Sequence, residues 1–173
     1  VRGANTTIDY ASTSLVNSIA KISNHLPCRA GFRETTTVND GIFKCAGCAR
    51  GTYKNFDGHG NCTQCPRGTY QNMEGQTACI PCMAGTYSKF PGENVGCTLC
   101  EQGTHQPDIG SSACLACPDG QQNTPLHHFC ENCPAGKFSN ITFGSCMTCP
   151  DGLFAPSNGM RECNICPGGF ESN

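Results

Sequence analysis

Cys65-Pro-Arg-Gly-Thr-Tyr70, closed by Cys79-Ile-Pro-Cys82, sets the pattern for most of this chain. The same phrase starts again at once as Cys82-Met-Ala-Gly-Thr-Tyr87, and it stands earlier as Cys48-Ala-Arg-Gly-Thr-Tyr53. The repeated unit is therefore Cys-x-x-Gly-Thr-Tyr, a variable loop and Cys-x-x-Cys. Self-similarity at a fixed period is typical of a repeat architecture, in which neighbouring units stack on one another.

The repeats run without a linker, so residues 28–173 form one array of eight complete repeats and the start of a ninth. Each repeat begins with a leading cysteine, and these are Cys28, Cys48, Cys65, Cys82, Cys100, Cys117, Cys133, Cys149 and Cys166. Each complete repeat ends with a closing cysteine, and these are Cys45, Cys62, Cys79, Cys97, Cys114, Cys130, Cys146 and Cys163. A glycine stands three places after every leading cysteine, at Gly31, Gly51, Gly68, Gly85, Gly103, Gly120, Gly136, Gly152 and Gly169. Because glycine tolerates a positive φ, we expect a tight bend to recur there.

Two further positions are periodic. An aromatic residue follows this glycine in most copies, and we expect its ring to pack beside the disulfide; His105 and Gln122 replace it in the fifth and sixth repeats. A second glycine precedes the closing cysteine by four or five residues and suits the return turn of a short hairpin, at Gly41, Gly58, Gly75, Gly92, Gly110 and Gly159. The sixth repeat lacks it and carries Thr124-Pro125, and the seventh has Gly144 displaced towards its closing cysteine. We expect the regular stacking to bend at these two repeats.

The composition is typical of a disulfide-stabilised extracellular protein. The 173 residues include 17 cysteines and no tryptophan, and only 37% are hydrophobic with the cysteines counted. A core this thin usually needs covalent cross-links. The scattered net charge of −2 gives no reason to expect a nucleic acid partner. No apolar run approaches the roughly 20 residues that span a bilayer, and the missing signal-peptide core leads us to expect a mature or internal fragment.

The cysteines admit two disulfide arrangements. Joining each leading cysteine to the closing cysteine of its own repeat uses sixteen of them and leaves Cys166 to pair beyond Asn173. Each closed loop of about 15 residues would then contribute roughly 3 kcal/mol in the chain-entropy model. We favour this serial pairing, although spacing alone does not fix connectivity, and an interlocked pairing between neighbouring repeats stays open.

Metal and redox chemistry are the other uses of such cysteines. Two Cys-x-x-Cys knuckles could build a four-thiolate zinc site, but the odd cysteine count and the absence of a basic surface argue against it. A thioredoxin-like pair needs one low-pKa cysteine in a βαβ context, which eight equivalent pairs in glycine-rich loops do not offer. His127-His128 are the remaining metal candidates, and adjacent loop histidines are more often simply exposed. We expect no metal, no cofactor and no enzymatic activity.

Residues 1–27 precede the repeats and form a cap or docking segment. Four apolar residues recur there at helical spacing and predict one short amphipathic helix that Pro27 ends: Leu15, Ile19, Ile22 and Leu26. This stripe either covers the first repeat or contacts a neighbouring molecule. Three further sites satisfy the N-glycosylation pattern, at Asn5, Asn61 and Asn140.

The phrase Cys-Pro-x-Gly-Thr-Tyr, followed by glycine and Cys-x-x-Cys, resembles the cysteine-rich repeat of Eph receptors and of tandem Eph-receptor-like surface proteins of animals and protists. It is also similar to the simplest module of tumour necrosis factor receptors, in which the cysteine before Gly-x-aromatic pairs with the next cysteine. The resemblance covers residues 28–173; the Cys65–Cys82 copy matches best and Cys117–Cys133 departs most. It implies an extracellular setting and an elongated rod, but no single activity.

We therefore predict a small disulfide-rich repeat fold, an elongated linear solenoid of short β-hairpin-like modules with one short N-terminal helix. The expected function is a non-enzymatic, glycosylated structural or adhesive rod, a subunit of a coat or filament at the cell surface. Its expected partners are further copies of itself or other extracellular proteins, joined head to tail through the Leu15–Leu26 stripe. The alternative is a receptor ectodomain segment that binds a protein ligand, for which Arg50 and Arg67 are the only anchor pair.

Overall fold

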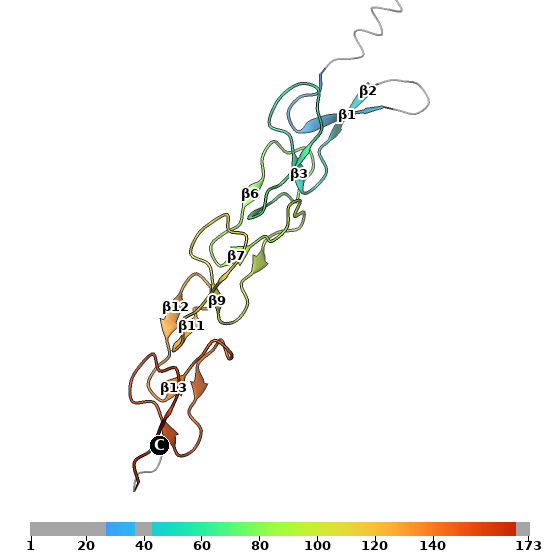
Figure 1. The fold of residues 1–173 in the computed structure, drawn as a ribbon. Helices are drawn as coiled ribbons and strands as arrows, with labels where there is room; N and C mark the ends of the chain where they lie inside the picture. Colours follow the sequence, from blue (N-terminus) through green and yellow to red (C-terminus); the bar gives the residue numbers. More distant parts are fainter. Residues whose placement is uncertain (1–26, 37–42, 169–173) are drawn as a thin grey trace, which may run out of the picture.

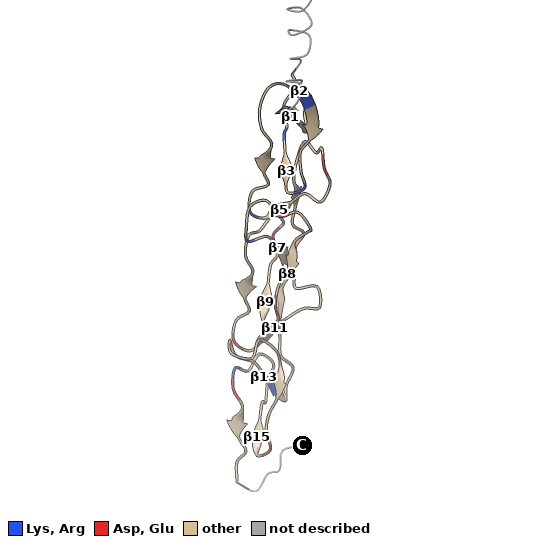
Figure 2. Cartoon of the chain, turned by 90° about the vertical axis from the view of Figure 1, so that its right-hand side faces the viewer, with Lys and Arg blue, Asp and Glu red and all other residues tan. Residues whose placement is uncertain are grey.

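The computed structural model describes residues 27–36 and 43–168, and these form a narrow rod (Figure 1). A view at right angles shows the same elongated outline (Figure 2). The small disulfide-rich repeat fold predicted from the sequence is confirmed. The predicted N-terminal helix, with its stripe of Leu15, Ile19, Ile22 and Leu26, lies outside the described residues and stays a prediction.

Each repeat of the described chain holds one antiparallel hairpin of two short strands. The first strand follows the leading glycine, and the second lies between the closing cysteine and the next leading cysteine or spans the closing cysteine. The hairpins are β1 (Phe32–Thr36) with β2 (Phe43–Gly47), β3 (Thr52–Tyr53) with β4 (Thr63–Gln64), β5 (Thr69–Tyr70) with β6 (Ile80–Pro81), β7 (Thr86–Tyr87) with β8 (Thr98–Leu99), β9 (Thr104–His105) with β10 (Leu115–Ala116), β11 (Gln121–Asn123) with β12 (Cys130–Asn132), β13 (Lys137–Phe138) with β14 (Met147–Thr148), and β15 (Leu153–Phe154) with β16 (Asn164–Ile165).

The repeated Cys-x-x-Gly-Thr segment folds as a tight turn. In the third repeat the Thr69 amide donates to the carbonyl of Pro66 at 3.1 Å, and Gly68 between them has a φ of +78°. A positive φ at the third residue is what a type II turn requires, and glycine supplies it without strain. The Thr69 hydroxyl donates to the same carbonyl at 2.7 Å, which explains the threonine of the motif. The predicted recurring bend is confirmed, since the leading glycines of all eight described repeats have a positive φ.

The disulfides follow the serial arrangement. The structure joins Cys28–Cys45, Cys48–Cys62, Cys65–Cys79, Cys82–Cys97, Cys100–Cys114, Cys117–Cys130, Cys133–Cys146 and Cys149–Cys163. Their Cα–Cα distances run from 5.4 to 5.9 Å, within the span that a disulfide bridges. Each bond therefore closes its own hairpin, and Cys166 is the one unpaired cysteine among the described residues.

The core is a column of leading cysteines rather than of aromatic rings. The leading cysteines from Cys28 to Cys133 are at most 6% exposed, whereas the tyrosines at the strand ends, such as Tyr70, stay half-buried. The residue after the aromatic position is also buried, and in five repeats it is polar: Lys54, Gln71, Ser88, Gln106 and Ser139. Hydrogen bonding must therefore satisfy part of this interior.

Successive repeats are tied together by backbone hydrogen bonds. The Gly68 amide of the third repeat donates to the Ser88 carbonyl of the fourth at 2.9 Å, and the Gly92 amide of the fourth donates back to Cys65 at 2.8 Å. The contact also reaches the next repeat but one: a Cβ added to Gly68 would lie 1.9 Å from the carbonyl oxygen of Gly110. The leading glycines of the first six repeats thus allow the backbones of alternate repeats to touch.

Candidate functional site

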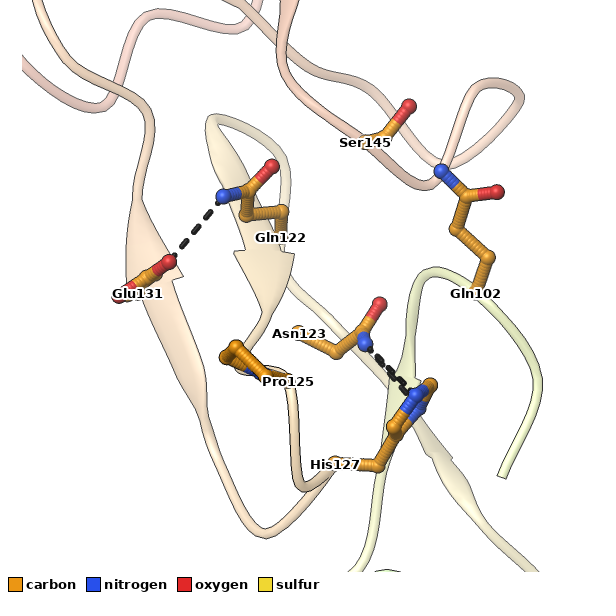
Figure 3. A pocket seen from close by; sticks show the side chains of 7 residues that line it. All are labelled: Gln102, Gln122, Asn123, Pro125, His127, Glu131 and Ser145. Carbon is orange, nitrogen blue, oxygen red and sulfur yellow. Dashed lines mark hydrogen bonds between the residues drawn. The ribbon is translucent and has the colours of Figure 1, made fainter. Parts of the chain in front are cut away.

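An open pocket of about 390 Å³ lies where the fifth, sixth and seventh repeats meet. Figure 3 shows the side chains that line it, which are Gln102, Gln122, Asn123, Pro125, His127, Glu131 and Ser145. Gln102 comes from the turn before β9, Ser145 from the loop before β14, and the other five from β11, β12 and the loop between them. The volume falls in the range of small-molecule pockets, about 300–1,000 Å³.

The pocket lies beside the sixth repeat, where the motif breaks down. In the regular repeats the leading glycine amide donates to a backbone carbonyl, as Gly85 does to Gln106 at 2.7 Å. Gly103 donates instead to the side-chain oxygen of Asn123 at 2.7 Å. The next residue, Thr124, then occupies the buried position. This one-residue shift separates the β11–β12 loop from the regular pattern.

The same loop holds His127 in an uncommon conformation. Its φ of +55° makes it the only non-glycine residue with positive φ in the described chain. The conformation is supported on both sides, because the His127 amide donates to Thr124 at 2.8 Å and its carbonyl accepts from Gln106 at 2.8 Å. The Asn123 side-chain amide lies 3.0 Å from Nδ1 of the imidazole and fixes the ring. Strained residues held in this way are concentrated at functional sites.

Two more lining side chains are held by hydrogen bonds. The Gln122 amide donates to Glu131 Oε1 at 3.1 Å across the β11–β12 hairpin (Figure 3). Its oxygen accepts from the Cys146 amide of the seventh repeat at 3.2 Å. The amide of Gln102 and the hydroxyl of Ser145 have no hydrogen-bond partner within the described chain. The pocket therefore combines fixed polar groups with free ones.

The rod keeps its direction past the sixth and seventh repeats in both views (Figures 1 and 2). The bend that the shorter repeats predict is therefore not seen. The irregular sequence changes the loops instead of the axis, because the serial disulfides and the inter-repeat bond from the Gly120 amide to Ser139 at 2.7 Å are kept.

One histidine–sulfur cluster lies beside this pocket. His105 Nδ1 is 3.0 Å from the sulfur of Cys130 and 3.9 Å from that of Cys117. These two sulfurs are joined in a disulfide, so they cannot act as the thiolate ligands that zinc requires. The same reasoning sets the serial disulfides against the zinc interpretation of the Cys-x-x-Cys knuckles.

The structure separates most residues that the sequence singled out. Of the two adjacent histidines, His127 lines the pocket, whereas His128 lies near Gly85. Arg50 and Arg67 are both exposed, as the receptor hypothesis requires. Asn61 is exposed, and Asn140 is half-buried with its side-chain oxygen accepting from Thr142 at 3.0 Å. Asn5 lies outside the described residues, and glycosylation at all three positions stays a prediction.

The sequence reasoning missed the other six residues of the pocket. Gln102, Pro125, Glu131 and Ser145 stand at variable positions, so the repeat pattern carries no information about them. The available signal was the loss of the pattern at Gln122, together with the missing second glycine of the sixth repeat. A departure from an otherwise consistent pattern is expected at a functional or strained site, and the sixth repeat is such a departure.

The architecture defines the chain as a tandem array of small cystine-closed repeats. The family described as tyrosine-protein kinase ephrin type A/B receptor-like matches residues 36–67, 56–93, 85–128 and 136–172, well over half of the chain. The chain belongs to this family. Disulfide-rich repeats of this kind are typical of extracellular domains, where they serve as ligand-binding or structural modules. No curated protein matches the chain, and the described residues include no helix long and apolar enough to cross a membrane.

Proposed function

We propose that the chain is a non-enzymatic, glycosylated extracellular rod that serves as a structural or adhesive subunit of a surface coat or filament. The observation that supports this most strongly is the unbroken stacking of eight cystine-closed repeats. In the described chain the first six repeats contact both the next repeat and the next but one, as Gly68 does with Ser88 and Gly110. Bending the rod would disturb several repeats at once, so its length and direction are well defined.

The surface supports an adhesive role. Fifteen large apolar side chains are exposed along the described part of the rod: Phe56, Met73, Ile80, Met83, Phe90, Val95, Leu99, Ile109, Leu115, Leu126, Phe129, Ile141, Phe143, Met147 and Ile165. We take these side chains as the groups that would contact other protein surfaces in an adhesive assembly. Further copies of this chain and other extracellular proteins are the partners we propose.

Assembly would extend head to tail. Unlike ends that join form a heterologous contact, which continues into fibres unless the rotation closes a ring. The N-terminal stripe is the proposed junction, at Leu15, Ile19, Ile22 and Leu26. Negative-stain electron microscopy of the concentrated protein should show particles much longer than one rod. The double substitution Ile19→Asp and Ile22→Asp should leave single rods, whereas Asn17→Asp and Ser18→Asp, at polar positions between the residues of the stripe, should not.

Two results would contradict this assembly. The first is that the parent protein shows only single rods at high concentration. The second is that the Ile19→Asp, Ile22→Asp protein still forms long particles. Either result would favour the alternative function, a ligand-binding ectodomain. The pocket beside the sixth repeat is the observation that supports this alternative.

A further inference from the structure

We propose that the pocket between the fifth and seventh repeats binds a neutral saccharide, a function separate from assembly of the rod. Its side chains offer three carboxamides, one hydroxyl, one carboxylate and one imidazole. Carboxamides and hydroxyls both donate and accept hydrogen bonds. A sugar hydroxyl also does both, so a ring of hydroxyl groups matches this lining better than a ligand that only donates or only accepts.

The charge of the lining excludes the main alternatives. Among the described residues no lysine or arginine lines the pocket, so a phosphate, sulfate or carboxylate ligand would lack the cationic partners that usually bind it. Glu131 is the single carboxylate of the lining, and it already accepts from Gln122. Calcium takes six to eight oxygen ligands with several carboxylates among them, which this lining does not provide. A neutral ligand is therefore favoured over an anion or a metal ion.

The groups that would contact the sugar are already in place. Asn123 and Gln122 are fixed by bonds to Gly103 and Cys146, in the repeats before and after their own. The ligand would then find oriented polar groups and would not have to order them, which lowers the entropic cost of binding. Three consecutive repeats build the site, so it depends on the stacking of the rod.

The free groups supply the remaining contacts. The Gln102 carboxamide and the Ser145 hydroxyl have no partner within the described chain and stand at the rim of the same space (Figure 3). Pro125 and the His127 ring add the apolar surface against which the C–H face of a sugar ring can pack (Figure 3). Fixed polar groups, free polar groups and an apolar wall are the parts of a small-molecule site.

The probes for a test are the methyl glycosides of glucose, galactose, mannose and N-acetylglucosamine. Saturation-transfer NMR on the full chain should detect binding of at least one of them. Amide shifts of Gln122, Glu131 and Ser145 should move on titration, while those of the third repeat should not. The double substitution Gln102→Ala and Ser145→Ala removes only free side chains, so we expect it to keep the fold and to weaken binding about tenfold.

Asn72→Ala with Ser112→Ala is the matched control, because both residues are exposed and lie outside the pocket. It should bind like the parent. Saturation transfer from none of the four glycosides would overturn the proposal. So would binding that the double variant at Gln102 and Ser145 leaves unchanged, or a preference for sialic acid or inorganic phosphate over the neutral glycosides.

Discussion

The leading glycine should stabilise the rod in two ways. It adopts a positive φ in its own turn, and its missing side chain leaves room for the backbone of another repeat. Gly68 and Gly136 separate these two effects. Both have a positive φ, +78° and +82°. A Cβ on Gly68 would lie 1.9 Å from the oxygen and 2.6 Å from the carbon of the Gly110 carbonyl, whereas a Cβ on Gly136 meets nothing within 4 Å among the described residues. Alanine at either position therefore has the cost of a positive φ, but only alanine at Gly68 also collides with the backbone of another repeat.

The magnitudes follow from these distances. A non-glycine residue in the left-handed region costs about 1–2 kcal/mol, and both variants pay this. In Gly68→Ala the Gly110 backbone must also retreat by more than an ångström to reach ordinary contact, and the Gly110 amide bond to Cys82 at 2.8 Å opposes that movement. Overpacking of this kind costs about 1–3 kcal/mol more.

Amide hydrogen exchange measures this difference where it arises, because the disulfides keep each hairpin closed while the repeats separate. The Gly110 amide in Gly68→Ala should exchange faster than in the parent by a factor that exceeds the change at Gly159 in Gly136→Ala. The extra 1–3 kcal/mol corresponds to about 5- to 150-fold. Gly51→Ala should behave like Gly68→Ala, since its Cβ would lie 2.2 Å from the Gly92 oxygen.

Equal effects of Gly68→Ala and Gly136→Ala would refute this reasoning. The glycine would then serve its own turn alone, and the close approach of alternate repeats would carry no free energy. A larger effect of Gly136→Ala would refute it as well.

Two further predictions concern the interior. Lys54→Met should lower the free energy of unfolding of the first two repeats by about 1–3 kcal/mol. Lys54 is only 1% exposed, and the substitution removes the hydrogen bonds that its Nζ donates to the carbonyls of Cys28, Phe32 and Gly58. In the same denaturant titration Lys89→Met, at an exposed lysine, should change the free energy of unfolding by less than about 0.5 kcal/mol. Non-reducing peptide mapping should recover Cys65 linked to Cys79 and Cys82 linked to Cys97; a peptide that links Cys62 to Cys65, or free thiols with stoichiometric zinc, would contradict the serial arrangement.

The period of the sequence predicted what every repeat shares. The hairpin, the positive φ of Gly68 and the disulfide from Cys65 to Cys79 depend on residues within one repeat, so a single copy already contains the information. Contacts between copies are different. Gly68 meets Gly110 in the next repeat but one, and the period cannot say which copies touch because all copies look alike. The pocket could not be predicted for a different reason: most of its residues stand at variable positions, and Gln122 stands where the repeated aromatic residue is lost.

The buried position after the aromatic residue shows a third reason why pattern and structure differ. It holds lysine, glutamine, serine and alanine in different repeats, so no residue type identifies it. The hydrogen bonds explain this freedom. Gln71 donates to Ala78 at 2.8 Å and accepts from the Met73 amide at 3.1 Å within its own hairpin. Gln106 makes the equivalent bonds to Ala113 and Asp108.

The buried Lys54 is also hydrogen-bonded, but to other partners, because its longer side chain reaches the Cys28 and Phe32 carbonyls of the first repeat. Ala155 removes the polar group altogether and needs no partner. The buried position therefore accepts different residues, provided that any polar group placed there has a hydrogen-bond partner.

Ser139 is the exception within the described chain, since its hydroxyl is buried without a partner. Ser139→Ala should for that reason leave the unfolding free energy unchanged or raise it, whereas Gln71→Ala, which strands the Ala78 carbonyl and the Met73 amide, should lower it by about 1–3 kcal/mol. A loss of stability in Ser139→Ala as large as in Gln71→Ala would show that satisfaction is not what this position requires.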